Sequence, residues 1–192
     1  LSSIFTNPTD LNILSLIEYS KFSNLVNVFI HLFRNMVDHG IETEDERIEK
    51  TKPQKGKIKL LFRKNERNFE IEIQDDGQGI NLDKIKKKAI EDGLKSKDEI
   101  SSISRQDVLD LIFLPGFSTK EDVTDISGRG IGMDAVRKEV LRLNGKIQVS
   151  SKLDEGTTFI INCCVKNISL ATSSAYRVFY LHQFSLANAS YH

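Results

Sequence analysis

The chain has 192 residues, 28% of them charged, and its 27 lysines and arginines balance 27 aspartates and glutamates. This length fits one domain with a sizeable core plus an appendage, and the balanced charge excludes bulk attraction to nucleic acid or an anionic membrane as the main mode of recognition, so any phosphate binding must arise from local geometry. The sequence contains neither a run of about 18 apolar residues nor a basic start followed by an apolar signal segment, so we expect a soluble cytoplasmic protein without membrane insertion. The start at Leu1 is consistent with a fragment.

Residues 22–37 predict a long amphipathic helix with a polar stripe, and Gly40 is placed to end it. His31, Asn35 and Asp38 follow one another at i, i+4 and i+7, which places them on one side of an α-helix. The apolar residues that recur at helical spacing are Phe22, Leu25, Val26, Phe29, Leu32, Phe33 and Met36.

The polar stripe has chemical potential. An amide oxygen such as that of Asn35 is a suitable hard ligand for Mg²⁺, which keeps most of its waters and takes further ligands from phosphates. The imidazole of His31, one turn away, could polarise a metal-bound water or contact a transferring phosphate. A solvated helix face explains the same stripe equally well.

Two strand-like runs follow, residues 57–63 and 68–75, and we expect them to form a hairpin. The second run ends at Asp75, where Gly77 and Gly79 would let another group approach the backbone. A carboxylate at this point can accept a hydrogen bond from an exocyclic amine such as that of adenine. An ordinary Asp-Gly turn is the competing interpretation.

Helices are predicted for residues 82–92 and 106–113, a mobile loop for 114–127 and another helix for 133–143. Three glycines precede the last helix and could bring backbone N–H groups and a helix N-terminus against phosphate oxygens. They do not fit a dinucleotide-binding fold, because a polar loop precedes them and no second βαβ unit follows. They are Gly128, Gly130 and Gly132.

The chain closes with strands predicted for residues 146–152 and 157–165 and with a tail of different character. Residues 167–192 are rich in serine and alanine, and Arg177 is the only lysine, arginine, aspartate or glutamate among them. We expect residues 1–166 to form the domain and the tail to be peripheral or poorly ordered.

The order of these motifs carries more weight than any one of them. Taken together they closely resemble the catalytic domain of CheA-type chemotaxis histidine kinases, within the GHKL ATPase superfamily, over roughly residues 13–165. The resemblance implies an α/β (α+β) two-layer sandwich of the Bergerat type, in which helices cover one face of a mixed sheet and a mobile lid closes over ATP. The matching segments are HLFRNMVDHGIE (31–42), DDGQGI (75–80), IFLPGFSTKEDVTDISGRGIGMDAVR (112–137) and EGTTF (155–159).

The resemblance also implies residue roles. Asn35 would be the Mg²⁺ ligand, and His31 would stand where other superfamily members often have a catalytic glutamate. Asp38 and His39 would line the phosphate end, and Asp75 would hold the adenine amine. Only one of the two adjacent threonines near the adenine can face the site, because side chains alternate along a strand. The further implied nucleotide contacts are Gly77, Gly79, Ile80, Phe117, Ser118, Thr119, Gly128, Gly130, Ile131, Gly132, Met133 and either Thr157 or Thr158.

By the same resemblance, the γ-phosphate of Mg-ATP would pass to a histidine on a separate phosphotransfer domain and on to a response regulator. Neither His182 nor His192 has the sequence context of a phosphoacceptor, and the dimerisation element would lie outside this chain. Two alternatives stay open: a non-catalytic nucleotide-binding module in a signalling complex, and another ATPase of the superfamily. Family members usually continue into a receptor-coupling domain, whereas here Lys166 and Asn167 lead into the tail, which puts receptor coupling through this chain in doubt.

Overall fold

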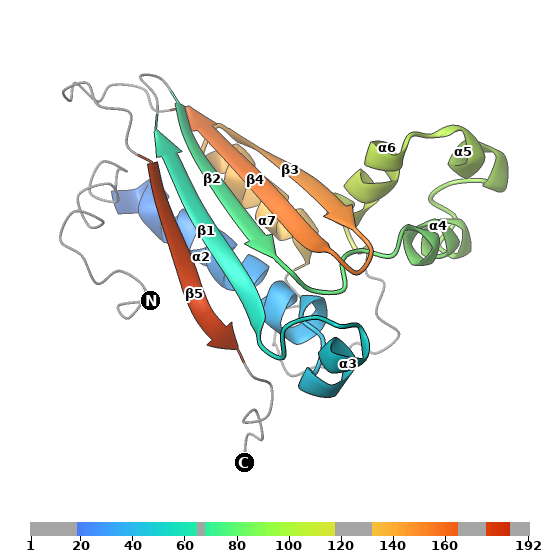
Figure 1. Ribbon diagram of the computed structural model, residues 1–192. Coiled ribbons are helices and arrows are strands. Elements are labelled where there is room, and N and C mark those ends of the chain that lie inside the picture. The colour runs from blue at the N-terminus through green and yellow to red at the C-terminus, as the bar shows by residue number, and fades with distance from the viewer. Residues whose placement is uncertain (1–18, 65–67, 118–131, 165–175, 185–192) are drawn as a thin grey trace, which may run out of the picture.

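The structure is a computed structural model that describes residues 19–64, 68–117, 132–164 and 176–184. These segments build two layers, a twisted sheet with α2 and α7 packed on one face (Figure 1). The shorter helices α4, α5 and α6 project beyond one edge of the sheet, and α3 lies near the beginning of β1. The predicted two-layer α+β architecture is confirmed.

Most of the predicted helices are present, with shifted ends. The first predicted helix ends as an α-helix two residues before its predicted end, and the chain continues as a π-helical turn, η1. Two further short helices, α3 and α5, begin with capping boxes. The helical elements are α2 (Tyr19–Asn35), η1 (Met36–Gly40), α3 (Glu44–Glu49), α4 (Leu82–Glu91), α5 (Lys97–Ser102), α6 (Arg105–Asp110), η2 (Leu111–Phe113) and α7 (Met133–Arg142).

The described strands form one five-stranded sheet in the order β3-β4-β2-β1-β5. Every pairing between them is antiparallel, so the prediction of a mixed sheet is wrong in this detail. β2, β3 and β5 run in one direction and β1 and β4 in the other, and strands of the two directions alternate across the sheet. The strands are β1 (Gly56–Lys64), β2 (Asn68–Asp75), β3 (Gly145–Lys152), β4 (Gly156–Cys164) and β5 (Tyr176–Phe184).

The main core fills the space between the sheet and the two long helices. Alternation along β2 and β4 turns Ile71, Ile73 and Phe159 toward α2 and α7, where Leu32 and Val136 are fully buried. A second cluster joins α4, α5 and α6 beside the sheet. Its members are Ile85, Ala89, Ile100, Val108, Leu111 and Phe117.

Part of the tail pairs with the sheet. Residues 176–184 form β5, which was not predicted and which pairs with β1 at the edge of the sheet, with Leu61 opposite Val178. Within the described parts of the chain, no helix is both long and apolar enough to cross a membrane.

Candidate functional site

Asp75 is the most deeply buried acidic side chain at the end of β2, with 2% of the residue exposed. Its Oδ1 accepts hydrogen bonds from the backbone N–H groups of Gly77, at 2.9 Å, and Thr157, at 3.2 Å. Among the described residues no donor lies on Oδ2, which faces the backbone of Gly40; a Cβ at position 40 would lie 3.6 Å from it. The carboxylate therefore offers one oxygen to a ligand that enters beside η1.

The environment of Asp75 perturbs its ionisation. Burial raises the pKa of this carboxyl from its usual 3.8 to about 6, although the N–H groups of Gly77 and Thr157 stabilise the charged form. At neutral pH the group is ionised but poorly solvated. A ligand that donates a hydrogen bond to Oδ2 would relieve this cost.

Glycines allow three backbone segments to meet around Asp75. A Cβ on Gly77 would lie 2.0 Å from the carbonyl oxygen of Gly40, and the same oxygen accepts a hydrogen bond from the N–H of Gln78 at 2.8 Å. Gly79 has φ of +69°, and a Cβ there would lie 2.2 Å from the carbonyl oxygen of Lys152. Both glycines of the predicted motif thus allow close packing of backbone on backbone, which differs from the predicted role of giving a ligand room.

The turn between β3 and β4 closes another side of the site. Ser151 accepts a hydrogen bond from the N–H of Ile80 at 2.7 Å, and its hydroxyl lies 3.1 Å from that of Thr157. Thr157 is buried and shares the helix-covered face with Asp75, whereas Thr158 pairs with Gln74 on the opposite face. Thr157 is therefore the threonine placed beside Asp75.

The helix end supplies the second half of the site. Asn35 is partly buried, and its Nδ2 donates a hydrogen bond to the Sδ of Met133 at 3.2 Å. Its Oδ1 has no donor among the described residues and is the acceptor end of the amide. His31 lies one turn earlier; burial, and then the neighbouring Arg34 guanidinium, lower the pKa of its imidazole below 6.5. This shift favours the neutral form of the ring.

The π-helical turn changes the predicted stripe. The N–H of Ile41 donates to the carbonyl oxygen of Met36 at 2.7 Å, five residues back, so the regular i, i+4, i+7 spacing does not extend to Asp38. Asp38 and His39 are both exposed, and the carbonyl oxygen of His39 accepts a hydrogen bond from Gln78 Nε2 at 2.6 Å. The η1 backbone is thereby fastened to the turn after β2.

Phe113 and Phe117, both in the matching segment 112–137, are packed into different clusters. Phe113 belongs to the main core, and the Arg137 guanidinium lies 5.4 Å from the centre of its ring; Phe117 belongs to the cluster of α4 to α6. Gly132 is the N-cap of α7, directly before Met133. The predicted contacts Ser118, Thr119, Gly128, Gly130 and Ile131 lie outside the described residues.

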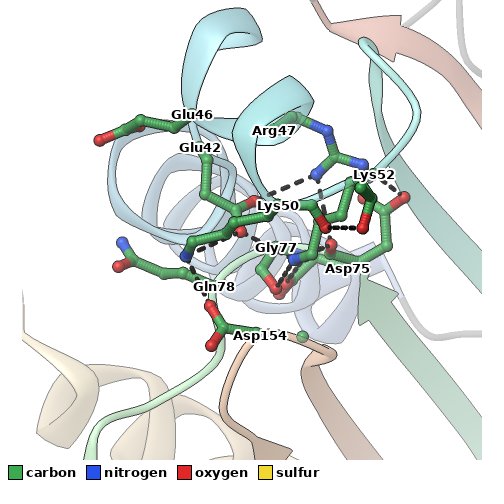
Figure 2. A network of polar contacts seen from close by, with 12 residues as sticks. Glu42, Glu46, Arg47, Lys50, Lys52, Asp75, Gly77, Gln78 and Asp154 are labelled. Atoms are coloured by element: carbon green, nitrogen blue, oxygen red, sulfur yellow. Dashed lines mark hydrogen bonds and ion pairs between the residues drawn. The ribbon is translucent and has the colours of Figure 1, made fainter.

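Sequence reasoning missed a group of charged residues around the turn after β2 (Figure 2). Arg47 and Glu42 are buried and form an ion pair of 3.1 Å, and Arg47 also pairs with Asp76 at 2.9 Å. Lys52 lies 2.7 Å from Glu42, while Lys50 lies 2.5 Å from Asp154. The capping-box pattern Thr43-x-x-Glu46 could have indicated α3, but no spacing rule indicates that Arg47 is buried.

Described residues include no group of three or more histidines, cysteines, aspartates or glutamates that could hold a metal ion. The arrangement that remains is one buried carboxylate, one amide oxygen and a neutral imidazole, distributed along a site formed by η1, the turn after β2 and the β3–β4 turn. Such a site can recognise an amine at one end and hold a hydrated cation with phosphate groups at the other.

Comparisons with known proteins identify one family of similar sequences. The family model for histidine kinase-, DNA gyrase B- and HSP90-like ATPases covers residues 23–167. The chain is 48% identical to the chemotaxis protein CheA of Halobacterium salinarum over 143 residues, which are 74% of this chain and 21% of that protein.

Other relatives belong to distant bacteria. The chain is 43% identical to the sensor histidine kinase CheAY of Helicobacter pylori over 142 residues, covering 74% of this chain and 18% of that protein. It is 37% identical to the gliding motility regulatory protein of Myxococcus xanthus over 145 residues, covering 76% of this chain and 19% of that protein. The chain thus spans about a fifth of the length of the curated relatives it matches.

Proposed function

This chain belongs to the histidine kinase-, DNA gyrase B- and HSP90-like ATPase family, and from that membership we propose that it is the Mg-ATP-binding catalytic domain of a CheA-like histidine kinase. Its reaction is transfer of the ATP γ-phosphoryl group to a histidine on a separate phosphotransfer domain, with a response regulator downstream. The observation that carries the proposal is the buried Asp75 carboxylate with one oxygen left for a donor.

Asp75 is the adenine acceptor in this proposal. Support comes from its free Oδ2, from its raised pKa, and from the buried hydroxyl of Thr157 at the same end of the sheet. The 6-amino group of adenine donates a hydrogen bond and matches an acceptor of this kind, whereas a 6-oxo base presents an acceptor to an acceptor. The site therefore favours ATP over GTP.

Asn35 and His31 form the phosphate end. The Asn35 Oδ1 fits Mg²⁺, a hard cation that is satisfied by a single protein oxygen when phosphates and waters complete its shell. When bound, Mg²⁺ supplies charge neutralisation along the triphosphate. The hydrogen bond from Asn35 Nδ2 to Met133 fixes which end of the amide faces that position.

The transfer itself breaks the bond between the γ-phosphorus and the bridging oxygen of ADP and forms a phosphorus–nitrogen bond on the acceptor imidazole, which loses its proton. Positioning and electrostatic stabilisation supply most of the catalysis in such reactions. In this proposal His31, one turn before Asn35 on α2, polarises the reacting groups, and no side chain of the chain forms a covalent intermediate.

The proposal is tested by phosphotransfer from labelled ATP to a supplied phosphotransfer domain. We expect transfer with the wild-type chain and a loss of about 100-fold or more with Asn35→Ala, because removal of one charge-stabilising group in a transfer site has effects of this order. Asn27→Ala, at an exposed position two turns earlier on α2, is the matched control and should transfer normally. Equal rates for Asn35→Ala and wild type would remove the metal-ligand role.

Calorimetry separates the remaining interpretations. A folded chain that does not bind ATP contradicts the kinase proposal. A chain that binds ATP but transfers nothing to any phosphotransfer domain is a nucleotide-binding module instead.

A further inference from the structure

The charged residues Glu42, Arg47, Lys52 and Asp76 form a network, here called the clasp, between the end of η1 and the turn after β2. Figure 2 shows Glu42, Arg47 and Lys52 of this network. The Arg47 guanidinium donates to Glu42 Oε2 at 3.1 Å, to Asp76 Oδ2 at 2.9 Å and to the carbonyl oxygen of Pro53 at 2.7 Å. Lys52 Nζ donates to Glu42 Oε1 at 2.7 Å. Segments that are far apart in the sequence are joined by these contacts.

Burial makes the clasp unusual as a source of stability. The Arg47 and Glu42 side chains are 1% and 3% exposed, and the favourable attraction of such a pair is largely offset by the loss of hydration of both charges. Burial opposes the ionisation of Glu42, but the hydrogen bond from Lys52, and to a smaller extent the charge of Arg47, hold the pKa of Glu42 below its usual value. Such a network therefore adds little net stability, and its main contribution is to fix the geometry of the groups that it joins.

The clasp acts on the peptide groups next to Asp75. Lys52 Nζ donates to the carbonyl oxygens of Asp76, at 3.1 Å, and Gly77, at 2.8 Å, while the Asp76 side chain also accepts from the N–H of Lys57 at 2.8 Å. These contacts fix both carbonyl groups of the turn. The N–H of Gly77, in the peptide between Asp76 and Gly77, is the donor to Asp75 Oδ1.

A defined path of contacts thus runs from the clasp to the carboxylate that was assigned to adenine. With Oδ1 held by the N–H groups of Gly77 and Thr157, the direction of Oδ2 depends on where the turn is held. Gly77 also sits against the carbonyl oxygen of Gly40, so a displacement of the turn would move the wall of the site as well.

We propose that Arg47 and Lys52 are positioning residues that aim Asp75 Oδ2 at the 6-amino group of the nucleotide, and so set the preference of the site for adenine. This inference rests on the proposed function. Neither cation touches the nucleotide in this proposal; both act through the turn formed by Asp76 and Gly77.

The test compares the affinities of ATP and of purine riboside triphosphate, which lacks the 6-amino group, by calorimetry with Mg²⁺ present. For the wild type we expect ATP to bind at least about tenfold more tightly, the effect of one hydrogen bond to a charged acceptor. In Lys52→Met this ratio should fall by about threefold or more, because the carbonyl groups of the turn lose their cation. Lys52→Arg should recover most of the ratio.

The ratio is a readout that a merely structural role does not move, since partial unfolding weakens both nucleotides by the same factor. The matched control is Lys87→Met, which removes the same charge from an exposed position on α4 and should keep the wild-type ratio. Should Lys52→Met fail to fold, Arg47→Lys gives the same test, because it keeps the buried charge and loses the planar fork that spans Glu42 and Asp76.

The outcomes separate the inference from the function beneath it. A wild-type chain that binds neither nucleotide overturns the proposed function, and equal binding of both overturns the role of Asp75 and with it the clasp. Discrimination that is intact in the wild type and unchanged in the folded variants of Lys52 or Arg47 overturns the positioning role alone.

Discussion

At the scale of single residues, Asp75 combines a stability cost with a binding function. Its carboxyl is buried, accepts two backbone hydrogen bonds and still has a pKa of about 6. Keeping such a group ionised at pH 7 lowers the stability of the folded protein but provides a preorganised hydrogen-bond acceptor, as functional sites commonly do.

The pH dependence of stability tests this interpretation. Because the folded-state pKa of Asp75 lies above its usual 3.8, the folded chain retains a proton that the unfolded chain loses between about pH 4 and pH 6. Stability from this group is fully present below about pH 4 and is lost as pH rises through about 6. Relative to Asp75→Asn, we expect wild-type free energy of unfolding to fall by about 3 kcal/mol from pH 4 to pH 7, measured by urea denaturation.

Glu99 provides a control of opposite sign. The backbone and side-chain hydrogen bonds of Ser96 at the start of α5 lower the pKa of Glu99, so its contribution is present at neutral pH and lost on acidification. The difference between wild type and Glu99→Gln should therefore grow with rising pH. A pH-independent difference for Asp75→Asn would mean that burial does not perturb this carboxyl.

Single residues also mark the limit of sequence reasoning. Asp75 was identified because an Asp-x-Gly-x-Gly order is a local pattern; Thr157 and Thr158 were implied by the family resemblance, and strand alternation limited the choice to one of them. Arg47 was not, because its burial depends on Asp76, 29 positions away, and on the backbone of Pro53. Local spacing carries no information about such a contact.

At the scale of elements, the site depends on the approach of η1 to the turn after β2. The long helix was predictable from its apolar period, but its change to a π-helical turn was not, because the sequence pattern is compatible with a regular helix as far as Asp38. The hairpins were predictable from alternation and turn residues. Their assembly order was not: β4 lies between β2 and β3, so the described sheet is antiparallel throughout instead of mixed.

Gly77→Ala tests the contact between these elements. The added Cβ would lie 2.0 Å from the carbonyl oxygen of Gly40, so η1 and the turn must move apart. We expect a loss of about 3 kcal/mol or more in the free energy of unfolding and no measurable ATP binding, by urea denaturation and calorimetry.

The matched control for this substitution is Gly93→Ala at the end of α4. Gly93 has φ of +68° but open space around it, so the substitution should cost about 1 kcal/mol of backbone strain and leave ATP binding unchanged. Similar effects at the two positions would show that Gly77 is not required for close packing.

At the scale of the whole molecule, the main core and the site are built from segments that alternate along the chain. The site takes residues from α2, β2, the β3–β4 turn and the start of α7, while the described core extends from Leu25 to Ile161. The tail contributes β5, which pairs with the outer edge of β1, on the far side of the sheet from β3. Whether residues 167–192 are an appendage or part of the domain therefore depends on how much the pairing of β5 with β1 contributes to the fold.

Deletion of residues 165–192 addresses that question. The described core cluster lies wholly before the cut, so we expect the truncated chain to fold and to bind ATP within about twofold of the full chain. The free energy of unfolding should fall by roughly 1–3 kcal/mol, because the β1–β5 backbone hydrogen bonds are exchanged for bonds to water. The uncovered β1 edge should also increase self-association, measured by sedimentation.

Val178→Pro, which removes a backbone donor opposite Leu61, should reproduce a smaller loss of stability in the full chain. A truncated chain that does not fold or does not bind ATP would make the tail an integral part of the domain.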